Sequence, residues 1–378
     1  MESAVIAGYV RSPFTPANNG ELARVRPDEI AQQVVRALLE RTGAPAPEVE
    51  DLMVGCSSPE AEQGLNMARL VVFLAGLPVS TAGVTINRFC GSSMQAIHTA
   101  AGAIAMGSGE VFVCAGVESM TRVPIWGFNP MPHPGLHEAY PEAYTSMGLT
   151  AENVAQRFGV SRKDQEAFSL ASHQKAADAW QEGRYAAEIV PIRDGDRVVA
   201  TDGCLRPDTS LEKLAALKPV FLAGGTVTAG TSSPLTDGAS AVLVCSERYA
   251  RERQLPILAR IRATAVSGCA PEIMGMGPVE STRKALARAG LALEDIDVIE
   301  LNEAFAAQAL AVIRELGIDD GKLNLDGGAL ALGHPLGASG ARITGKAASL
   351  LQREGGRYAL STMCIGGGQG IATVLEAI

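Results

Sequence analysis

Aromatic residues, positive charge and long apolar runs are all scarce in this sequence. No apolar run approaches the roughly 20 residues that a membrane-spanning helix needs. The net charge of −9 argues against a nucleic-acid surface and against a polybasic membrane patch. It leaves room for a local basic site that holds an anionic ligand. The first residues read as a strand and not as a signal peptide, so we expect a cytoplasmic protein.

The sequence also lacks any paired-cysteine motif. Its seven cysteines are scattered, with no C-x-x-C pair, and the odd number favours a reduced intracellular protein over a disulfide framework. Its five histidines show none of the spacings typical of zinc ligands. We therefore expect no metal site.

The sequence is rich in glycine, and predicted strands alternate along it with predicted helices. Forty-one glycines with few aromatic residues are typical of close backbone packing and tight turns. Apolar runs of strand length alternate with helical periodicity, which predicts an α/β fold with a mostly parallel sheet covered on both faces. The first strands are expected at 5–9, 51–55, 82–87 and 110–116, with helices at 27–42, 66–75 and 91–106.

The last third of the chain repeats this order. Strands at 297–301, 322–325 and 358–363 follow one another as those at 51–55, 82–87 and 110–116 do, which indicates an internal duplication. Between the two units, residues 118–234 are too long for a structureless loop. We expect a small subdomain there, with helix starts at Thr150 and Ser161, lying over a site at the interface of the two units.

Cys90 is the first candidate for chemistry. It stands where a short apolar run ends and a helix of small residues begins. Unpaired backbone N–H groups and the helix dipole favour the thiolate there. The arrangement resembles a nucleophile elbow with Cys in place of Ser. The alternative is an inert buried cysteine.

Three further polar residues follow predicted strands in the second unit. His334 lies in a glycine-rich elbow and is a natural general base near neutral pH. Cys364 precedes a glycine run whose N–H groups suit an anion, and Asn302 follows a buried strand. Each has a structural alternative, namely a satisfied histidine, a buried cysteine and a helix cap. Because open α/β sheets bind ligands at the carboxyl ends of strands, we expect these residues to meet Cys90. One thiol would serve as nucleophile and the other as acid/base.

These stretches, taken in order, resemble the thiolase family over essentially the whole chain. The matching motifs are N-R-F-C-G-S-S-M-Q-A (87–96), M-G-L-T-A-E (147–152), V-T-A-G-T-S-S (227–233), N-E-A-F-A-A-Q (302–308), G-G-A-L-A-L-G-H-P-L-G-A-S-G (327–340) and C-I-G-G-G-Q-G (364–370). The resemblance implies a thiolase-like α/β fold with two duplicated αβαβα-type halves and an inserted loop subdomain. We place an N-terminal half at 1–118, completed by about 236–256, the loop subdomain at 119–235 and a C-terminal half at 257–378.

The resemblance also implies roles for the site residues. Cys90 would carry the acyl group, and His334 would activate it. A first oxyanion hole would consist of His334 and a water on Asn302, and a second of the N–H groups of Cys90 and Gly366. Cys364 would protonate the enolate of acetyl-CoA and then deprotonate the incoming CoA thiol.

Contacts to CoA are implied at Ser233, Arg206, Phe221, Met147 and Met274. Phe305 is expected to line the acyl pocket. CoA is then a substrate, and no bound cofactor is expected. The resemblance further implies a homodimer or a dimer of dimers, with a possible partner enzyme from β-oxidation.

The family resemblance leaves the direction of the reaction to be decided. Short-chain condensing members typically have His before the Met-Gly of the covering loop, whereas this chain has Ser146. Its L-R-P-D-T-S at 205–210 is also similar to the degradative group. We therefore expect thiolytic cleavage of 3-ketoacyl-CoA, as in fatty-acid β-oxidation.

Three other functions compete with this reading. The chain could instead be an acetyl-CoA C-acetyltransferase or an acyl-CoA-binding protein without activity. A decarboxylating ketoacyl synthase is a further rival, but such enzymes usually pair the cysteine with two histidines, and here only His334 lies in a matching motif.

Overall fold

The computed structural model describes residues 2–378, which contain one large sheet. The strands of this sheet are β1 (Ala4–Arg11), β2 (Thr15–Pro16), β3 (Asp51–Gly55), β4 (Ala82–Ile86), β5 (Val111–Ser119), β8 (Thr236–Ser246), β9 (Ala259–Gly268), β10 (Val298–Leu301), β11 (Tyr358–Ile365) and β12 (Gln369–Glu376). They lie in the order β10-β11-β12-β9-β1-β8-β5-β3-β4, and β2 pairs with β8.

The expectation of a mostly parallel sheet is wrong. Only the pairs β3–β4, β3–β5 and β10–β11 are parallel, and the strands between them pair antiparallel. The turn of residues 366–368 joins β11 directly to β12, and so short a connection can only link antiparallel strands. Helical crossovers, which make strands parallel, connect only the outer strands of each half.

The strand order is symmetrical about its centre. Reading outward from the central pair, β1 is followed by β8, β5, β3 and β4, and β9 is followed by β12, β11 and β10. The two central strands pair antiparallel through Val5 with Arg260 and Ile6 with Ala259, as a two-fold relation between two equivalent strands requires. This order supports the duplication inferred from the sequence.

One predicted strand is missing from the second half. Residues 320–322 form a 3-10 turn, and the only ladder contact nearby is a bridge between Ile299 and Leu323. Asn324 adopts a left-handed φ of 43°, which ends the extended run. Its amide side chain instead accepts from the N–H of Leu301 at 3.0 Å and donates to its carbonyl at 2.9 Å, so that it takes the place of a neighbouring strand.

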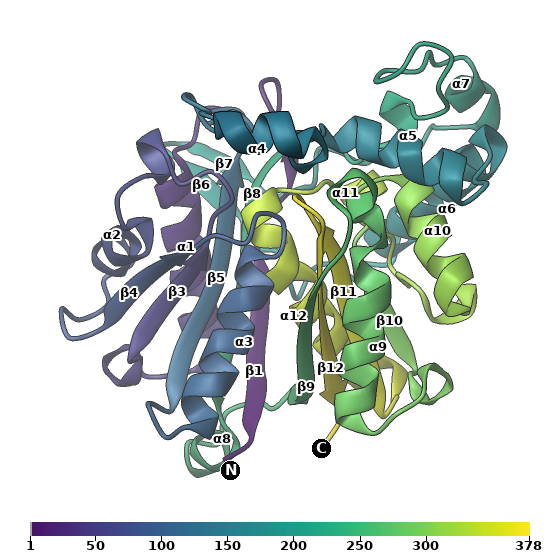
Figure 1. Cartoon of the computed structure of the whole chain (residues 1–378). Coiled ribbons are helices and arrows are strands. Elements are labelled where there is room, and N and C mark those ends of the chain that lie inside the picture. Colours follow the sequence, from purple (N-terminus) through teal and green to yellow (C-terminus); the bar gives the residue numbers. More distant parts are fainter. Residues whose placement is uncertain (1) are drawn as a thin grey trace.

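Helices cover the sheet on both faces and fill the middle of the molecule (Figure 1). They are α1 (Pro27–Thr42), α2 (Met67–Leu74), α3 (Ser92–Ala105), α8 (Glu247–Glu252), α9 (Gly277–Ala289), α10 (Ala306–Leu316), α11 (Ala329–Leu332) and α12 (Leu336–Glu354). In the centre, α3 packs against α12, which touches strands of both halves. A Cβ on Gly340 would lie 2.4 Å from the backbone nitrogen of Met94, so glycine is required at this close contact.

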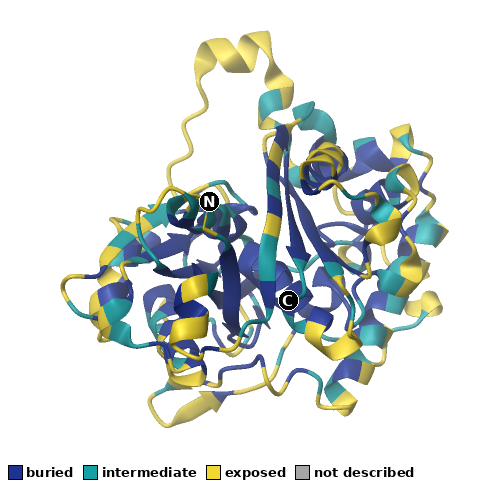
Figure 2. Ribbon diagram, turned by 90° about the horizontal axis from the view of Figure 1, so that it is seen from below, coloured by how far each residue is buried: buried dark blue, intermediate teal, exposed yellow. Residues whose placement is uncertain are grey.

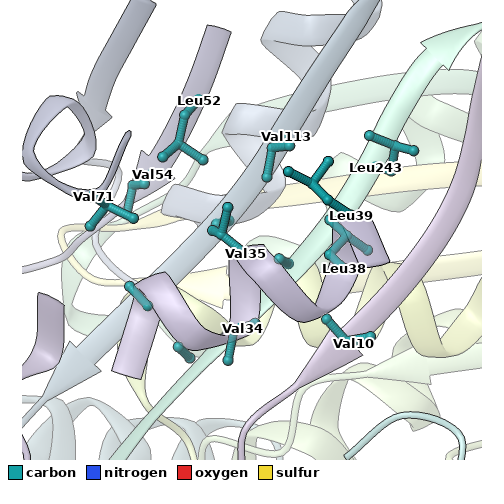
Figure 3. Close-up of a cluster of buried hydrophobic side chains, with 14 of the residues drawn as sticks. Val10, Val34, Val35, Leu38, Leu39, Leu52, Val54, Val71, Val113 and Leu243 are labelled. Atoms are coloured by element: carbon teal, nitrogen blue, oxygen red, sulfur yellow. The ribbon is translucent and has the colours of Figure 1, made fainter. Parts of the chain in front are cut away.

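The outer helix α1 buries the apolar face that its sequence period predicts. Val34, Val35 and Leu38 are fully buried. They point toward side chains of neighbouring strands and of α2, including Leu52 and Val113 (Figure 3). The helix begins with Pro27 at its first position and ends at Gly43, whose φ of 73° suits glycine.

The segment between β5 and β8 lies over one end of the sheet. It contains α4 (Pro134–Ala139), α5 (Met147–Arg157), α6 (Arg162–Gln181), α7 (Leu211–Ala215) and a hairpin of β6 (Ile192–Asp194) and β7 (Arg197–Val199). Ser161 caps α6 as predicted, since its hydroxyl accepts from the N–H of Asp164. The expected helix start at Thr150 is wrong, because α5 begins at Met147 and the Thr150 hydroxyl bonds to the Met147 carbonyl inside the first turn.

Within this segment, α4 and its flanking residues extend away from the body of the protein (Figure 2). Nearly every side chain between residues 124 and 146 is exposed. Several of these side chains are large and apolar, among them Trp126, Phe128 and Met131. We call residues 124–146 the arm.

Candidate active site

Cys90 lies in the sharp turn between β4 and α3. Phe89, directly before it, has a left-handed φ of 43°, which is unusual for a bulky residue. The turn is held by its own side chains, because Asn87 accepts from the N–H of Phe89 at 2.8 Å and Ser92 donates to the Phe89 carbonyl at 2.5 Å. The strand–turn–helix expected around the cysteine is therefore present, with the strain concentrated one residue before the thiol.

The backbone N–H groups expected at this turn do favour the Cys90 thiolate, but burial outweighs them. Burial raises the pKa of the Cys90 thiol to about 12, although the backbone N–H groups of Gly366 and of Cys90 itself lower it. The side chain is only 8% exposed, so water solvates the charged form too little for the helix end to compensate. Cys90 thus rests as a thiol.

A largely apolar cavity opens beside Cys90, His334 and Gly366. Of the other predicted residues, four line it, and these are Ser233, Met147, Met274 and Phe305. We call it the inner cavity. The structure therefore brings to one cavity residues from both halves and from the segment between β5 and β8, which we call the covering segment.

His334 is buried and oriented at three points. Its backbone N–H donates to the Thr236 hydroxyl at 3.0 Å, its Nδ1 lies 2.5 Å from the Ser339 hydroxyl, and its Nε2 lies 3.3 Å from the Asn302 amide nitrogen. Burial, with the charge of Arg342 as a second cause, lowers the pKa of His334 to about 3. The imidazole is therefore neutral near pH 7.

The contacts of Ser339 favour the tautomer of His334 in which Nδ1 carries the proton. The Ser339 hydroxyl donates to the Pro335 carbonyl at 3.0 Å, so its oxygen is free to accept from Nδ1–H. The lone pair then lies on Nε2, where Asn302 donates to it. A neutral imidazole with its lone pair on Nε2 is the form that can accept a proton from a thiol.

Cys364 lies near the end of β11, just before the glycine turn. It is fully buried, and burial raises the pKa of its thiol well above the usual value, as does the nearby Cys90. A negative charge on Cys90 would therefore make ionisation of Cys364 still less favourable. The turn itself uses Gly367 and Gly368 at φ of 78° and 81°, which leaves the Gly366 N–H beside Cys90.

The comparisons with known proteins agree with one another. Residues 4–248 match the thiolase N-terminal domain and residues 255–377 the thiolase C-terminal domain. The chain belongs to the thiolase family. A relative from Aliivibrio fischeri, named 3-ketoacyl-CoA thiolase, is 49% identical over all of both chains.

Two solved structures are similar to this thiolase over its whole length. The human mitochondrial 3-ketoacyl-CoA thiolase in complex with CoA has a TM-score of 0.92 and 37% identity, and the match covers 100% of this chain and 98% of that one. The Bacillus anthracis acetyl-CoA acetyltransferase has a TM-score of 0.91 and 38% identity, covering 100% and 99%. The predicted thiolase-like fold is confirmed.

Two of the predicted CoA contacts lie outside the inner cavity of this thiolase. Phe221 is 38% exposed and packs edge-on against Phe305, with ring centroids 6.0 Å apart. The side chain of Arg206 is exposed, and its backbone N–H donates to His173 Nδ1 at 3.2 Å. Both residues therefore lie farther out than the residues beside Cys90.

Glu118 is a site residue that the sequence analysis missed. This buried carboxylate at the end of β5 accepts from the N–H groups of Ser57 at 2.8 Å, Ser58 at 3.1 Å and Gly337 at 2.9 Å. It thereby ties two lining residues of the cavity to the first turn of α12, just after His334. An acid at the end of the wholly apolar run V-F-V-C-A-G-V was the available signal.

The described residues contain neither a metal-binding cluster nor a membrane-spanning helix. Within residues 2–378, no group of three or more His, Cys, Asp or Glu side chains could hold a metal ion. Over the same residues, no helix is both long enough and apolar enough to cross a membrane.

Proposed function

We propose that this thiolase cleaves 3-ketoacyl-CoA with CoA, giving acetyl-CoA and an acyl-CoA that is two carbons shorter. The observation that carries the proposal is the neutral pair of Cys90 and His334 at one cavity, next to the Gly366 N–H. The names of the relatives and of the human structure bound to CoA support the substrate class. No cofactor is needed, since CoA is itself a substrate.

In the first half-reaction, the Cys90 sulfur attacks the 3-keto carbon while its proton passes to His334 Nε2. The bond between C2 and C3 of the substrate then breaks. The acyl group stays on Cys90 as a thioester, and its oxygen accepts from the N–H groups of Cys90 and Gly366. The electron pair of the broken bond forms the enolate of acetyl-CoA, whose oxygen is stabilised by His334 and by a water on Asn302.

Cys364 completes the proton balance. Its thiol protonates the enolate carbon, which releases acetyl-CoA and leaves a Cys364 thiolate. That thiolate takes the proton of the incoming CoA thiol, and the CoA sulfur attacks the thioester. The Cys90 thiolate leaves and recovers its proton from His334. The high pKa of Cys364 suits it to protonate a carbanion, because it holds its proton until a strong base is present.

The CoA itself would enter along the residues of the covering segment. Met147 begins α5, and Glu152 on the same helix accepts from the N–H of Val227 at 2.9 Å, which fixes the loop that carries Ser233. We assign the pantetheine to Ser233, Met147 and Met274. Farther out, Arg206 and Phe221 would contact the nucleotide end. Phe305 separates the two regions and borders the acyl group.

The direct test is acyl-enzyme detection. The protein is mixed with acetoacetyl-CoA or 3-ketododecanoyl-CoA without CoA, and its intact mass is measured. An added acyl mass on Cys90 that disappears when CoA is supplied, with release of acyl-CoA, is the expected result. The Cys90→Ala variant should show neither, while Cys245→Ala, which removes a buried thiol far from the cavity, should show both. An absence of acyl-enzyme and turnover with every substrate would favour a binding-only protein.

A second candidate function is acetyl transfer between two acetyl-CoA molecules. The similarity to the Bacillus anthracis acetyl-CoA acetyltransferase supports it. Against it stands Ser146, directly before α5, where the condensing members carry His. Activity confined to acetoacetyl-CoA would decide for this candidate.

We also propose that the chain forms a homodimer through the β4 edge of its sheet. Among the described residues 2–378, no strand pairs with the outer side of β4, and an unpaired strand edge is a template for another chain. Apolar side chains are exposed beside this edge, with Val79 at 78% and Phe73 at 50%. A dimer of dimers, a β-oxidation partner enzyme and the cytoplasmic location remain predictions.

A further inference from the structure

Two cavities of this protein share one wall. The inner cavity beside Cys90 and a second cavity under the arm are both lined by Phe89 and Trp126. The two rings meet edge to face with their centroids 5.3 Å apart. We call the second space the outer cavity. The glycine turn borders both, with Gly366 on the inner side and Gly367 on the outer side.

The backbone is constrained at both residues of this wall. Phe89 and Trp126 have left-handed φ angles of 43° and 73°, which cost energy in bulky residues. The turn of Trp126 is closed by a hydrogen bond from the Gly127 N–H to the Pro124 carbonyl at 2.9 Å, and Glu60 accepts from the next N–H, that of Phe128, at 2.7 Å. Strain kept at two contacting residues marks the wall as a functional position.

The outer cavity suits a hydrocarbon. Beyond the two rings and Gly367, it is lined by Pro130, Met131, Pro132, Ala143 and Tyr144, with no charged side chain. Met131 is 82% exposed and its flexible thioether can adapt to chains of different length. Covering these exposed apolar side chains with an apolar group is favourable, because it removes apolar surface from water.

The catalytic geometry indicates which group that is. A thioester on Cys90, with its oxygen at the N–H groups of Cys90 and Gly366, lies directly beside Phe89. Its alkyl chain must leave this point away from His334, and the wall of Phe89 and Trp126 is the shared boundary with the outer cavity. We propose that the chain of medium and long 3-ketoacyl-CoA substrates crosses the wall of Phe89 and Trp126 into the outer cavity, with the two side chains rotating apart to admit it. Short acyl groups stay within the inner cavity. This proposal rests on the proposed thiolytic function.

A variant that fills the outer cavity tests the proposal. The measured quantity is the ratio of kcat/KM for 3-ketohexadecanoyl-CoA to that for acetoacetyl-CoA. Ala143→Trp should lower this ratio at least tenfold, since each methylene that loses its apolar site changes affinity about fourfold. The matched control is Leu136→Trp, which adds a large ring to the same arm outside both cavities. Equal ratios in both variants and the wild type would overturn the proposal.

A binding measurement gives a second test without turnover. Trp126 is 44% exposed, and the only other tryptophan, Trp180, can be replaced by Phe. In the Trp180→Phe protein, a saturating unreactive hexadecyl-CoA thioether should shift the Trp126 emission to shorter wavelength, while ethyl-CoA should not. An identical emission with both ligands, each shown to be bound by calorimetry, would exclude contact between the chain and Trp126.

The two proposals fail in different ways. A protein that cleaves neither substrate refutes the thiolytic function. A protein that cleaves acetoacetyl-CoA and 3-ketohexanoyl-CoA but not the long substrate keeps the thiolytic function and refutes the path into the outer cavity.

Discussion

Burial controls the protonation of the residues nearest the proposed reaction. The same desolvation that raises the pKa of Cys90 to about 12 lowers that of His334 to about 3, so both groups rest uncharged. An ion pair of thiolate and imidazolium would need stronger solvation than this apolar cavity provides. Charge therefore develops only when a substrate carbonyl is in place, next to N–H groups that can stabilise it.

The low pKa of His334 predicts a flat pH profile on the acid side. Between pH 8 and pH 5, kcat/KM for the 3-ketoacyl-CoA should not fall through protonation of this histidine, because its neutral form persists down to about pH 3. A histidine with an ordinary pKa of about 6.5 would lose about thirtyfold at pH 5. The measurement is the initial rate at low substrate, with recovery at pH 8 as the check on stability. A loss of activity centred near pH 6.5 would contradict the assignment.

Replacing Ser339 tests the orientation of His334. In Ser339→Ala the imidazole loses the acceptor for Nδ1–H, so both tautomers become accessible and less of the reactive one is present. We expect kcat to fall about tenfold to a hundredfold, a part of what a positioned base contributes. KM should change little, since Ser339 does not line the inner cavity.

The control for this prediction is Ser349→Ala, ten residues further along α12. This substitution also removes a serine hydroxyl from α12, but far from His334, and it should keep the wild-type kcat. Equal losses in both variants would mean that the helix, and not the tautomer, was affected. A pH-independent loss in Ser339→Ala alone is the expected signature.

At the scale of elements, a buried ion cluster holds α12 against the covering segment. Asp326 accepts from Lys346 at 2.7 Å and Arg353 at 2.6 Å on α12, and from Arg184 just beyond α6. Burial opposes the ionised form, but Arg353 and Lys346 lower the pKa of Asp326 to about 2. Because α12 starts directly after His334 and Pro335, the cluster also steadies the elbow that carries the proposed base.

This cluster predicts a pH dependence of stability. A carboxyl whose pKa is lowered on folding stabilises the protein above about pH 4 and loses that effect as pH falls toward 2. Asp326→Asn should lower the free energy of unfolding by about 2 kcal/mol at pH 7, since Lys346 loses one of its two buried acidic partners and keeps only Glu188. The gap to the wild type should shrink by about 1 kcal/mol at pH 3.

Urea denaturation at both pH values measures this gap. The control is Asp208→Asn, which breaks an exposed pair with Lys213 and should leave the midpoint near that of the wild type. A gap that is the same at pH 7 and pH 3 would show that the Asp326 carboxylate does not act through its charge.

At the scale of the whole molecule, the two edges of the symmetrical sheet differ. On the β10 side, Asn324 closes the edge with its amide, while on the other side β4 is open. An open edge flanked by exposed apolar side chains favours pairing with a second copy.

A charge on this edge should separate the copies. Val84 lies in β4 and is 37% exposed. Val84→Lys should shift the mass in light scattering from a dimer, or a larger multiple, toward the 39.3 kDa of one chain. Val198→Lys, on the exposed hairpin strand β7, is the control and should keep the wild-type mass. A wild-type protein that is already monomeric would refute the proposed interface.

Local sequence was sufficient wherever one short stretch decides the structure. The elbow at Cys90, the cap at Ser161 and the apolar face of α1 depend on neighbouring residues, and each was predicted correctly. The repeated strand order also follows from local patterns, and the topology supports it. Cys90 and His334 were predicted to meet because both were placed after strands, although a 3-10 turn replaces the strand expected before His334. Gly366 was predicted only from the resemblance to thiolases.

Tertiary structure decided what depends on distant neighbours. Strand direction in the centre of the sheet follows from how the halves join, and the pKa of Cys90 follows from how much of the chain covers it. The hydrogen bonds of Glu118 and the contact between Phe89 and Trp126 each join residues that are far apart in the chain. Such contacts have no local pattern, because burial and long-range hydrogen bonds arise only once the whole chain has packed.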